Sequence, residues 1–327
     1  MDISKADQKA VIVGISGCSS SGKTTLARLL RDIFPNTFIL HEDDFYKPEE
    51  QLPMKDGLRD WDCPEAISIP DMEAALAYIR RTGTFPVSST SPSSSPSSPV
   101  LLPPLPSRRS RSRSDHGCIY PNNNPPLFDC SPLTSQSRSH NTQPDVNSKE
   151  DKNSVGASPI TPDQIATLKS RVQSWLQPGH PGHAIFSTHP GLRICLLDGF
   201  LLYQKPDFAT IMSELDVKLF LTVSRQKATQ RREARDGYVT LEGFWKDPPG
   251  YVDKIVWPNY VQAHKWLFVD GDVEGGKLDE ETLRREGIKA QIGKGQDVDF
   301  RETLEWAVGA VMEALERRFL NSNSQAG

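Results

Sequence analysis

Short apolar runs alternate with amphipathic segments along most of the chain. Runs that a buried strand would use stand at 11–16, 38–40, 193–203, 217–223 and 266–271. Apolar residues at three- and four-residue spacing predict helices at 24–33, 69–81, 161–176 and 301–319. Strands separated by helices indicate an α/β fold with a parallel five-stranded sheet flanked by helices. In such a fold, ligands bind at the carboxyl ends of the strands.

The composition changes sharply near Pro86. From there to residue 160 the chain is rich in Ser, Pro, Asn and Arg, and few apolar positions recur. Such a segment cannot offset the entropy of ordering itself, so we expect a disordered insertion at 86–160 within a single domain formed by 1–85 and 161–327. Its run SRRSRSRS (107–114) fits a phosphorylation target, a nuclear-import signal or an RNA-binding tag, and the insertion could bind a partner through it. A tolerated surface loop is the simpler interpretation.

Charge and cysteine usage exclude several classes of protein. The net charge of −4 is not that of a polycation built for nucleic acid. The five cysteines are scattered, without a Cys-x-x-Cys pair, which argues against a disulfide framework or a zinc site and favours a reducing compartment. The N-terminus has no apolar signal region, and no stretch approaches the about 18 apolar residues of a membrane span. We therefore expect a cytoplasmic protein, with the nucleus as an alternative, that has no nucleic-acid or membrane partner.

Residues 17–24 fit the P-loop pattern G-x-x-x-x-G-K-[ST], between a predicted strand and a predicted helix. The glycines let backbone N–H groups curl around a polyphosphate at the positive end of the helix. Lys23 would reach the β- and γ-phosphates, and the Thr24 hydroxyl would sit on Mg²⁺. The predicted fold is thus that of a P-loop NTPase, although the motif alone does not say what the nucleotide is used for. Its ATP-binding residues would be Gly17, Cys18, Ser19, Ser20, Ser21, Gly22, Lys23, Thr24 and Thr25.

Two groups of acids follow predicted strands. Asp198 ends the run RICLL, where a P-loop protein keeps a metal-side acid, although Asp-Gly is also a common turn. The run HEDDF (41–45) follows the strand at 38–40. There Asp43 or Asp44 would lie near the transferred phosphate and accept the proton of an attacking hydroxyl. The alternative is a solvated acidic turn, and we expect Glu42 to be solvated in either case.

Two further segments suit a nucleoside and the phosphates, respectively. Trp61 could stack on a base while Asp62 accepts hydrogen bonds from two ribose hydroxyls. A core Trp61 with Asp62 capping the next helix is equally consistent with the sequence. Arg231, Arg232 and Arg235 could form a lid that stabilises phosphate charge, whereas a solvated basic helix face is the alternative.

Several motifs occur together in a familiar order: GISGCSSSGKTTLA, EDDFYKP, WDCPEA, LLDGFLL, RRxxR and DPPGYVDKIVWPNY. The chain thereby resembles the nicotinamide riboside kinases, in the uridine-kinase-like branch of the P-loop kinases. The match covers about residues 10–80 and 192–272 and leaves out the insertion. It implies transfer of the γ-phosphate of ATP, or of another NTP, to the 5′-hydroxyl of nicotinamide riboside, with Mg²⁺ as cofactor. Nicotinic acid riboside stays open as a second substrate.

The resemblance also implies a role for each matching position. Asp43 falls on the catalytic Asp, Asp62 and Arg232 on ribose-binding groups, and Asp247 on an acid near the nicotinamide amide. Trp61 and Tyr238 fall on aromatics that stack on the pyridine ring. Asp44 would be a supporting acid. The predicted catalytic residues are Asp43, Lys23, Arg231 and Arg235. The predicted metal ligands are Thr24, Asp43 and Asp198.

The chain departs from the family pattern in two ways. Asp198 stands where the family usually has Glu, so this shorter acid would reach Mg²⁺ through water or a small backbone shift. The insertion is absent from the compact members. Two other functions remain as hypotheses: a uridine/cytidine- or pantothenate-type kinase, and a catalytically weak NTP-binding regulator whose insertion recruits partners. The intact Lys23, Thr24 and Asp43 argue against the regulator.

Overall fold

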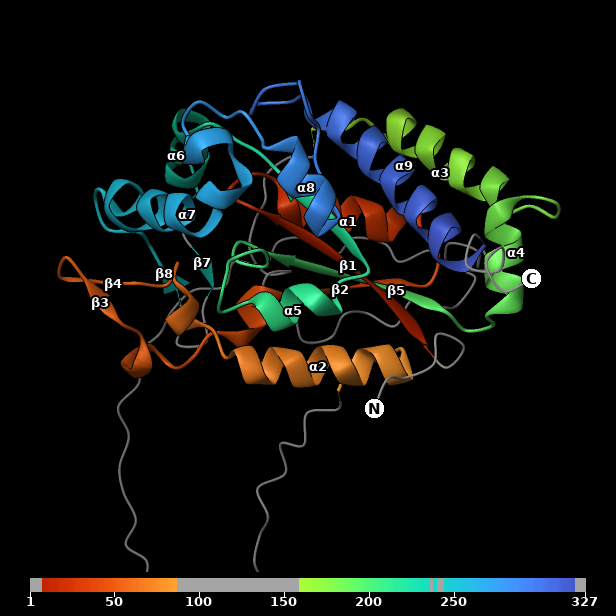
Figure 1. Ribbon diagram of the computed structural model, residues 1–327, viewed down its shortest axis with the longest axis horizontal. Helices are drawn as coiled ribbons and strands as arrows, with labels where there is room; N and C mark the ends of the chain where they lie inside the picture. Colours follow the sequence, from red (N-terminus) through yellow and green to blue (C-terminus); the bar gives the residue numbers. More distant parts are fainter. Residues whose placement is uncertain (1–7, 87–158, 236–237, 240–243, 321–327) are drawn as a thin grey trace, which may run out of the picture. The chain divides into compact units, whose positions relative to one another are not determined.

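The computed structural model describes residues 8–86, 159–235, 238–239 and 244–320, and within them five strands form one parallel sheet (Figure 1). The strand order is β2-β5-β1-β6-β9. The bounds are Ala10–Gly17 for β1, Thr37–His41 for β2, Arg193–Gly199 for β5, Val217–Leu221 for β6 and Ile288–Lys289 for β9. The predicted class, a parallel five-stranded sheet flanked by helices, is confirmed.

Helices cover both faces of the sheet because each central strand is apolar on both sides. Ala10 and Ile12 of β1 face one apolar cluster, whereas Val11, Val13 and Ile15 face another. The first cluster is closed by helices α2 (Ile69–Thr82), α5 (Ala209–Glu214), α6 (Arg225–Glu233), α7 (Trp257–His264) and α8 (Glu280–Glu286). The second is closed by α1 (Lys23–Ile33), α3 (Pro162–Trp175), α4 (Pro181–Thr188) and α9 (Phe300–Phe319). Figure 1 shows α2 and α5 on one side of the sheet and α1, α3 and α9 on the other.

Most predicted helices begin and end where the sequence indicates. Thr161 caps α3 as expected, and together with Gln164 it forms a capping box. Helix α4 was not predicted, because its segment is rich in Pro, Gly and His. Gly182 within this helix packs so closely that a Cβ would lie 2.5 Å from the Trp175 ring.

One predicted strand is wrong. Residues 266–271 form no strand of the sheet but lie in two short 3₁₀ helices, η7 (Lys265–Leu267) and η8 (Val269–Gly271). Asp270 has a φ of 55°, which interrupts extended backbone, while Leu267 and Phe268 are buried in the first apolar cluster. The apolar run therefore packs as core, and β9 supplies the fifth strand instead.

Smaller elements connect the helices and strands. Two antiparallel ribbons pair β3 (Met54–Lys55) with β4 (Leu58–Arg59) and β7 (Tyr238–Val239) with β8 (Phe244–Trp245). Further turns are the 3₁₀ helices η2 (Glu42–Phe45), η3 (Glu49–Gln51) and η4 (Pro64–Ala66), and the π-helix η6 (Val252–Val256).

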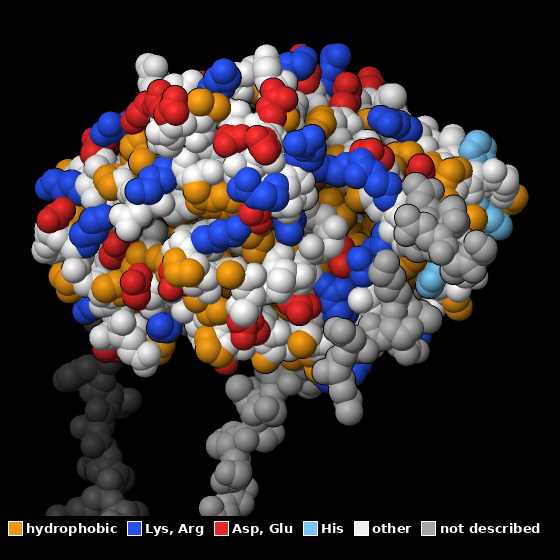
Figure 2. All heavy atoms as spheres, viewed as in Figure 1, with side chains coloured by type: hydrophobic (Ala, Val, Ile, Leu, Met, Phe, Trp, Pro, Cys, Tyr) orange, Lys and Arg blue, Asp and Glu red, His pale blue; other side chains and the backbone are white. Residues whose placement is uncertain are grey.

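The predicted insertion and the surface charges complete the description of the fold. The insertion predicted at 86–160 falls almost wholly outside the described residues, so its boundaries stay a prediction. Among the described residues, no helix combines the length and apolar character needed to cross a membrane. Figure 2 shows acidic and basic side chains intermixed over the described part of one face.

Candidate active site

Three segments that lie far apart in the sequence meet at the carboxyl ends of β1, β2 and β5. The P-loop follows β1, η2 follows β2, and Asp198 is the penultimate residue of β5. Parallel pairing sets the register, so that His41 of β2 lies opposite Asp198. The predicted phosphate, acceptor and metal residues thus come to one edge of the sheet, as the fold class requires.

The P-loop conformation depends on its two glycines. Gly17 has a φ of 149°, and a Cβ there would collide with the carbonyl oxygen of Leu221. Gly22 has a φ of 102°, and a Cβ there would lie 2.8 Å from the ring of Phe300 at the start of α9. The loop is therefore packed on both sides with no room for side chains at these positions.

The polar groups of the loop suit an anion. Lys23 is buried, and its Nζ donates to the carbonyl oxygen of Cys18 at 3.0 Å. The hydroxyls of Ser20 and Ser21 are buried without a hydrogen-bond partner among the described residues. Buried hydroxyls normally find a partner, and phosphate oxygens would supply one. These donors lie beside the N-terminus of α1, which favours negative charge.

Asp198 lies beside the P-loop, where a metal-side acid is predicted. Its Oδ2 accepts a hydrogen bond from the Thr24 hydroxyl at 2.6 Å, and its Oδ1 is paired with Nδ1 of His41. Burial works against a charged carboxylate here. Pairing with His41 and the hydrogen bond from Thr24 outweigh that effect, however, and hold the pKa of Asp198 below its usual range. Charged carboxylate and hydroxyl oxygens are ligands that Mg²⁺ prefers, so Thr24 and Asp198 fit this cation.

The expectation that Glu42 is solvated is wrong. Its side chain is fully buried, and Oε2 accepts a hydrogen bond from the backbone N–H of Leu201 at 3.1 Å. Burial raises the pKa of Glu42 to about 8. The carboxyl occupies the space beside Gly199, where any Cβ would collide with it. Glu42 therefore fastens the end of β2 to the turn after β5.

The two aspartates that follow differ from Glu42. Asp43 and Asp44 lie in η2 and are half-buried, directly beyond the carboxyl end of β2. The charge of Asp43 also acts on the neighbouring Tyr46 hydroxyl. Asp43 thus stands where an acceptor-side base is expected, and its role as the base stays a prediction.

Arg232 joins three other residues into a group that we call the Arg232 bridge: Ser19, Asp62, Arg232 and Asp247. Its Nε donates to Asp247 at 2.6 Å, and its Nη1 donates to Asp62 at 3.1 Å and to the Ser19 hydroxyl at 2.8 Å. Burial raises the pKa of Asp62, and the guanidinium works against that shift. The bridge brings together the ribose and amide residues that the resemblance implies, beside the P-loop.

The other predicted arginines lie at the same helix. Arg231 donates through Nη1 to the carbonyl oxygen of Ser20 at 3.2 Å, so α6 contacts the P-loop twice. Arg235 lies one residue beyond Ala234, the C-cap of α6, and is half-buried. A wholly solvated basic face is therefore excluded for Arg231 and Arg232.

The segment of Trp61 and Asp62 fits neither of its two predicted structures completely. Trp61 is 8 % exposed, and its ring packs edge-on against Tyr46, with centroids 5.2 Å apart. It belongs to an apolar cluster with Tyr251, as the core alternative predicts. Asp62 is no helix cap, however: η4 begins after Cys63 without a side-chain cap. Tyr238 pairs with Trp245 in the β7–β8 ribbon, and its side chain lies outside the described residues.

Sequence reasoning missed two residues of the site. Tyr251 accepts a hydrogen bond from the backbone N–H of Trp61 at 3.1 Å, and its ring lies 5.5 Å from the Arg232 guanidinium. The second is His41, which pairs with Asp198 and for which the sequence indicated no function. Its position directly before the acidic run was the available signal, but only the strand register reveals its partner.

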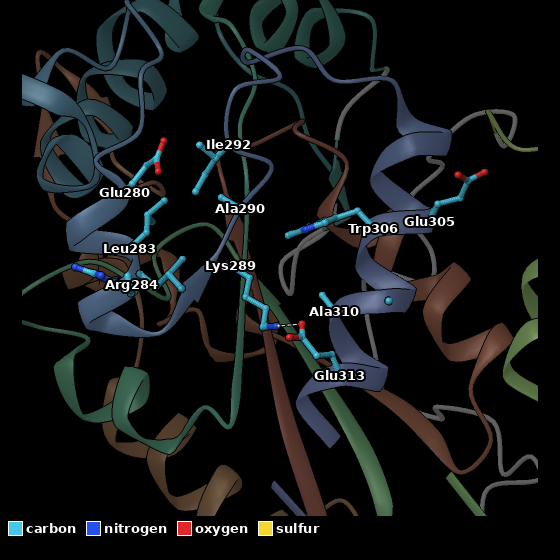
Figure 3. Close-up of a pocket in the computed structure, with 12 residues that line it drawn as sticks. Glu280, Leu283, Arg284, Lys289, Ala290, Ile292, Glu305, Trp306, Ala310 and Glu313 are labelled. Carbon is cyan, nitrogen blue, oxygen red and sulfur yellow. Dashed lines mark hydrogen bonds and ion pairs between the residues drawn. The ribbon is translucent and has the colours of Figure 1, made fainter. Parts of the chain in front are cut away.

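A cavity of about 500 Å³ lies elsewhere, between α8, β9 and α9 (Figure 3). Trp306 and Ile292 contribute apolar walls, and Lys289 pairs with Glu313 at 2.7 Å. None of the predicted site residues lines this cavity.

Several known proteins similar to this chain share one name. No protein-family model matches the chain. A nicotinamide riboside kinase of Schizosaccharomyces pombe is 30 % identical over 312 residues, which cover 94 % of this chain and 99 % of the relative. A nicotinamide riboside kinase of Saccharomyces cerevisiae is 27 % identical over 94 % of this chain and 97 % of its own length. The mouse nicotinamide riboside kinase 2 is 23 % identical over 96 % of this chain and 99 % of its own length. At this identity and coverage, the chain belongs to the nicotinamide riboside kinase family.

Proposed function

We propose that this enzyme transfers the γ-phosphate of ATP to the 5′-hydroxyl of nicotinamide riboside and so forms nicotinamide mononucleotide. Family membership supports the reaction class, and the Arg232 bridge is the observation that carries the proposal. One guanidinium links a P-loop hydroxyl to a buried carboxylate suited to ribose. Donor and acceptor would therefore bind within the reach of a single side chain.

The P-loop would hold the phosphates of ATP. The Lys23 ammonium, which now donates to the carbonyl oxygen of Cys18, would turn toward the β- and γ-phosphates, and the Ser20 and Ser21 hydroxyls would donate to them. Thr24, Asp43 and Asp198 would hold Mg²⁺, which neutralises charge on the phosphates when it is bound. Arg231 and Arg235 would stabilise the charge that develops on the transferred group.

The acceptor side would orient the nucleoside and remove one proton. Asp62 would accept hydrogen bonds from the ribose hydroxyls, with Arg232 beside it, while Asp247 would lie near the nicotinamide amide. Asp43 would accept the proton of the 5′-hydroxyl. The 5′-oxygen would bond to the γ-phosphorus while the bond from that phosphorus to the leaving ADP oxygen breaks. The ring of Trp61 would need to become more exposed to stack on the pyridine, and Tyr238 would offer a second aromatic face.

A panel of nucleosides tests the proposal. The protein is incubated with Mg-ATP and nicotinamide riboside, nicotinic acid riboside, uridine or cytidine, while ADP release is followed and the products are identified by mass spectrometry. We expect release with nicotinamide riboside, and use of nicotinic acid riboside would extend the substrate class. A Lys23→Ala variant controls for contaminating kinases. Release with uridine but not with nicotinamide riboside would overturn the proposal, and release with none would favour an NTP-binding regulator.

A further inference from the structure

His41 and Asp198 form a buried pair at the carboxyl ends of two neighbouring strands. The register of β2 and β5 places them opposite each other, and Nδ1 of His41 contacts Oδ1 of Asp198. The side chains are 1 % and 4 % exposed, so solvent cannot replace this contact. The contact joins a ring nitrogen to a carboxylate oxygen, so the imidazole N–H donates and the carboxylate accepts.

The pairing divides the two oxygens of one carboxylate between two partners. Oδ1 is held by His41, and Oδ2 accepts the hydroxyl of Thr24 at 2.6 Å. A carboxylate held at one oxygen cannot rotate freely about its terminal bond. The lone pairs of Oδ2 therefore keep a fixed direction toward Thr24.

We propose that His41 is a positioning residue, which holds Asp198 so that its Oδ2 and the Thr24 hydroxyl together receive the divalent cation of the nucleotide. The chain needs such a device because Asp198 is a short side chain with little reach of its own. Hydrogen bonds to ligating carboxylates are a general means of orienting them. This inference rests on the proposed kinase function only in that the cation arrives with a nucleotide. It is independent of which nucleoside is phosphorylated.

Two substitutions separate positioning from simple core filling. His41→Asn can place an amide N–H close to where Nδ1 stands, whereas His41→Leu fills a similar volume without a donor. Binding of Mn²⁺ to the protein–ADP complex is measured by electron paramagnetic resonance, and binding of metal-free ADP by calorimetry. Neither readout needs turnover, so failure of the nucleoside assay would leave this test intact.

We expect His41→Leu to weaken Mn²⁺ binding about tenfold or more, with little change for metal-free ADP. His41→Asn should recover most of the loss. In kinetics, the Mg²⁺ concentration for half-maximal kcat should rise in parallel while the KM for nucleoside stays unchanged. His264→Phe is the matched control: this buried histidine contacts Tyr260 and Phe220, and its replacement should leave Mn²⁺ binding at the wild-type level.

Equal Mn²⁺ affinities for wild type and His41→Leu would overturn the proposal, and so would an Asn variant as weak as the Leu variant. Should His41→Leu fail to fold, His41→Asn is compared with His41→Gln, whose longer amide lies nearer the position of Nε2. Positioning through Nδ1 requires the Asn variant to bind Mn²⁺ more tightly, and equal affinities of the two would refute it.

Discussion

Arg232 donates through Nη1 to Oδ1 of Asp62 at 3.1 Å, and both side chains are less than a tenth exposed. The same guanidinium reaches Asp247 and Ser19, so a single buried cation serves three acceptors. Removing one partner of a buried ion pair leaves the other charge uncompensated. Substitutions here must therefore preserve shape if binding is to be separated from folding.

Asp62→Asn keeps the shape of the side chain and removes its charge. A hydrogen bond to a charged group contributes about 1.5–3 kcal/mol, so we expect the KM for nicotinamide riboside to rise about ten- to hundredfold. The KM for ATP should stay near that of wild type. Asp253→Asn, in an exposed pair with Arg225 at 2.8 Å, is the control. An unchanged nucleoside KM would refute the ribose role of Asp62.

Asp43→Asn should separate catalysis from nucleotide binding. Loss of a general base lowers kcat by about 10²–10⁴-fold, whereas the P-loop proposed to bind ATP is left intact. Single-turnover kinetics and ATP binding by calorimetry measure the two effects. The neighbouring Asp44→Asn is the control and should lower kcat far less. The reverse order of the two variants would assign the base to Asp44.

Asp216 should matter for stability alone. It accepts from the backbone N–H of Ile12 at 2.8 Å and pairs with Arg80 at 3.1 Å and Arg318 at 2.9 Å. Asp216→Ala leaves these cations without their buried partner, so we expect a loss of about 3–5 kcal/mol in the free energy of unfolding. Urea denaturation measures this loss, with the exposed Asp253→Ala as control. A shift below about 1 kcal/mol would show that the network is solvated.

His264 should make stability depend on pH. Burial among aromatic rings lowers its pKa to about 4, while its unfolded pKa is 6.5. The unfolded chain therefore binds the proton first, and the stability contributed by the neutral ring is lost as the pH falls from 6.5 toward 4. His264→Phe removes this titration. Urea unfolding at pH 7 and pH 5 should show a larger acid loss in wild type than in the variant, and equal losses would contradict the assignment.

The insertion can be tested by replacement. If it is a tolerated surface segment, a flexible Gly/Ser linker in place of 88–158 should leave kcat and both KM values within about twofold of wild type. The flanking residues Phe85 and Ile160 stay in place, since Phe85 packs on Phe38 with centroids 4.9 Å apart and Ile160 is buried. A large loss of kcat would show that the segment takes part in closing the site.

Residues with strong local patterns were predictable from the sequence. The P-loop and the runs that became β1, β2, β5 and β6 could be read directly, because a buried parallel strand is apolar throughout. The fifth strand could not. The two residues of β9 are too few to show a pattern. The run at 266–271 is as apolar as a strand would be, but Leu267 and Phe268 pack in the core instead of joining the sheet.

The site shows the same limit. The resemblance to a known family indicated Asp62, Arg232 and Asp247 as one substrate site, and the structure brings these three side chains together. The state of Glu42 was not predictable, because three acids in a row indicate a solvated turn unless the neighbouring strand is known. The partner of His41 likewise depends on register, which is a property of the folded sheet and not of either segment.

The contact between Gly199 and Glu42 limits which substitutions the two positions can accept. The carboxyl of Glu42 fills the volume that a side chain at position 199 would need. The two positions are therefore sterically linked across 157 residues of sequence, the interval between 42 and 199. Gly199→Ala should be tolerated only together with a shorter residue at position 42. In relatives, a side chain at the first position should co-vary with a smaller group at the second.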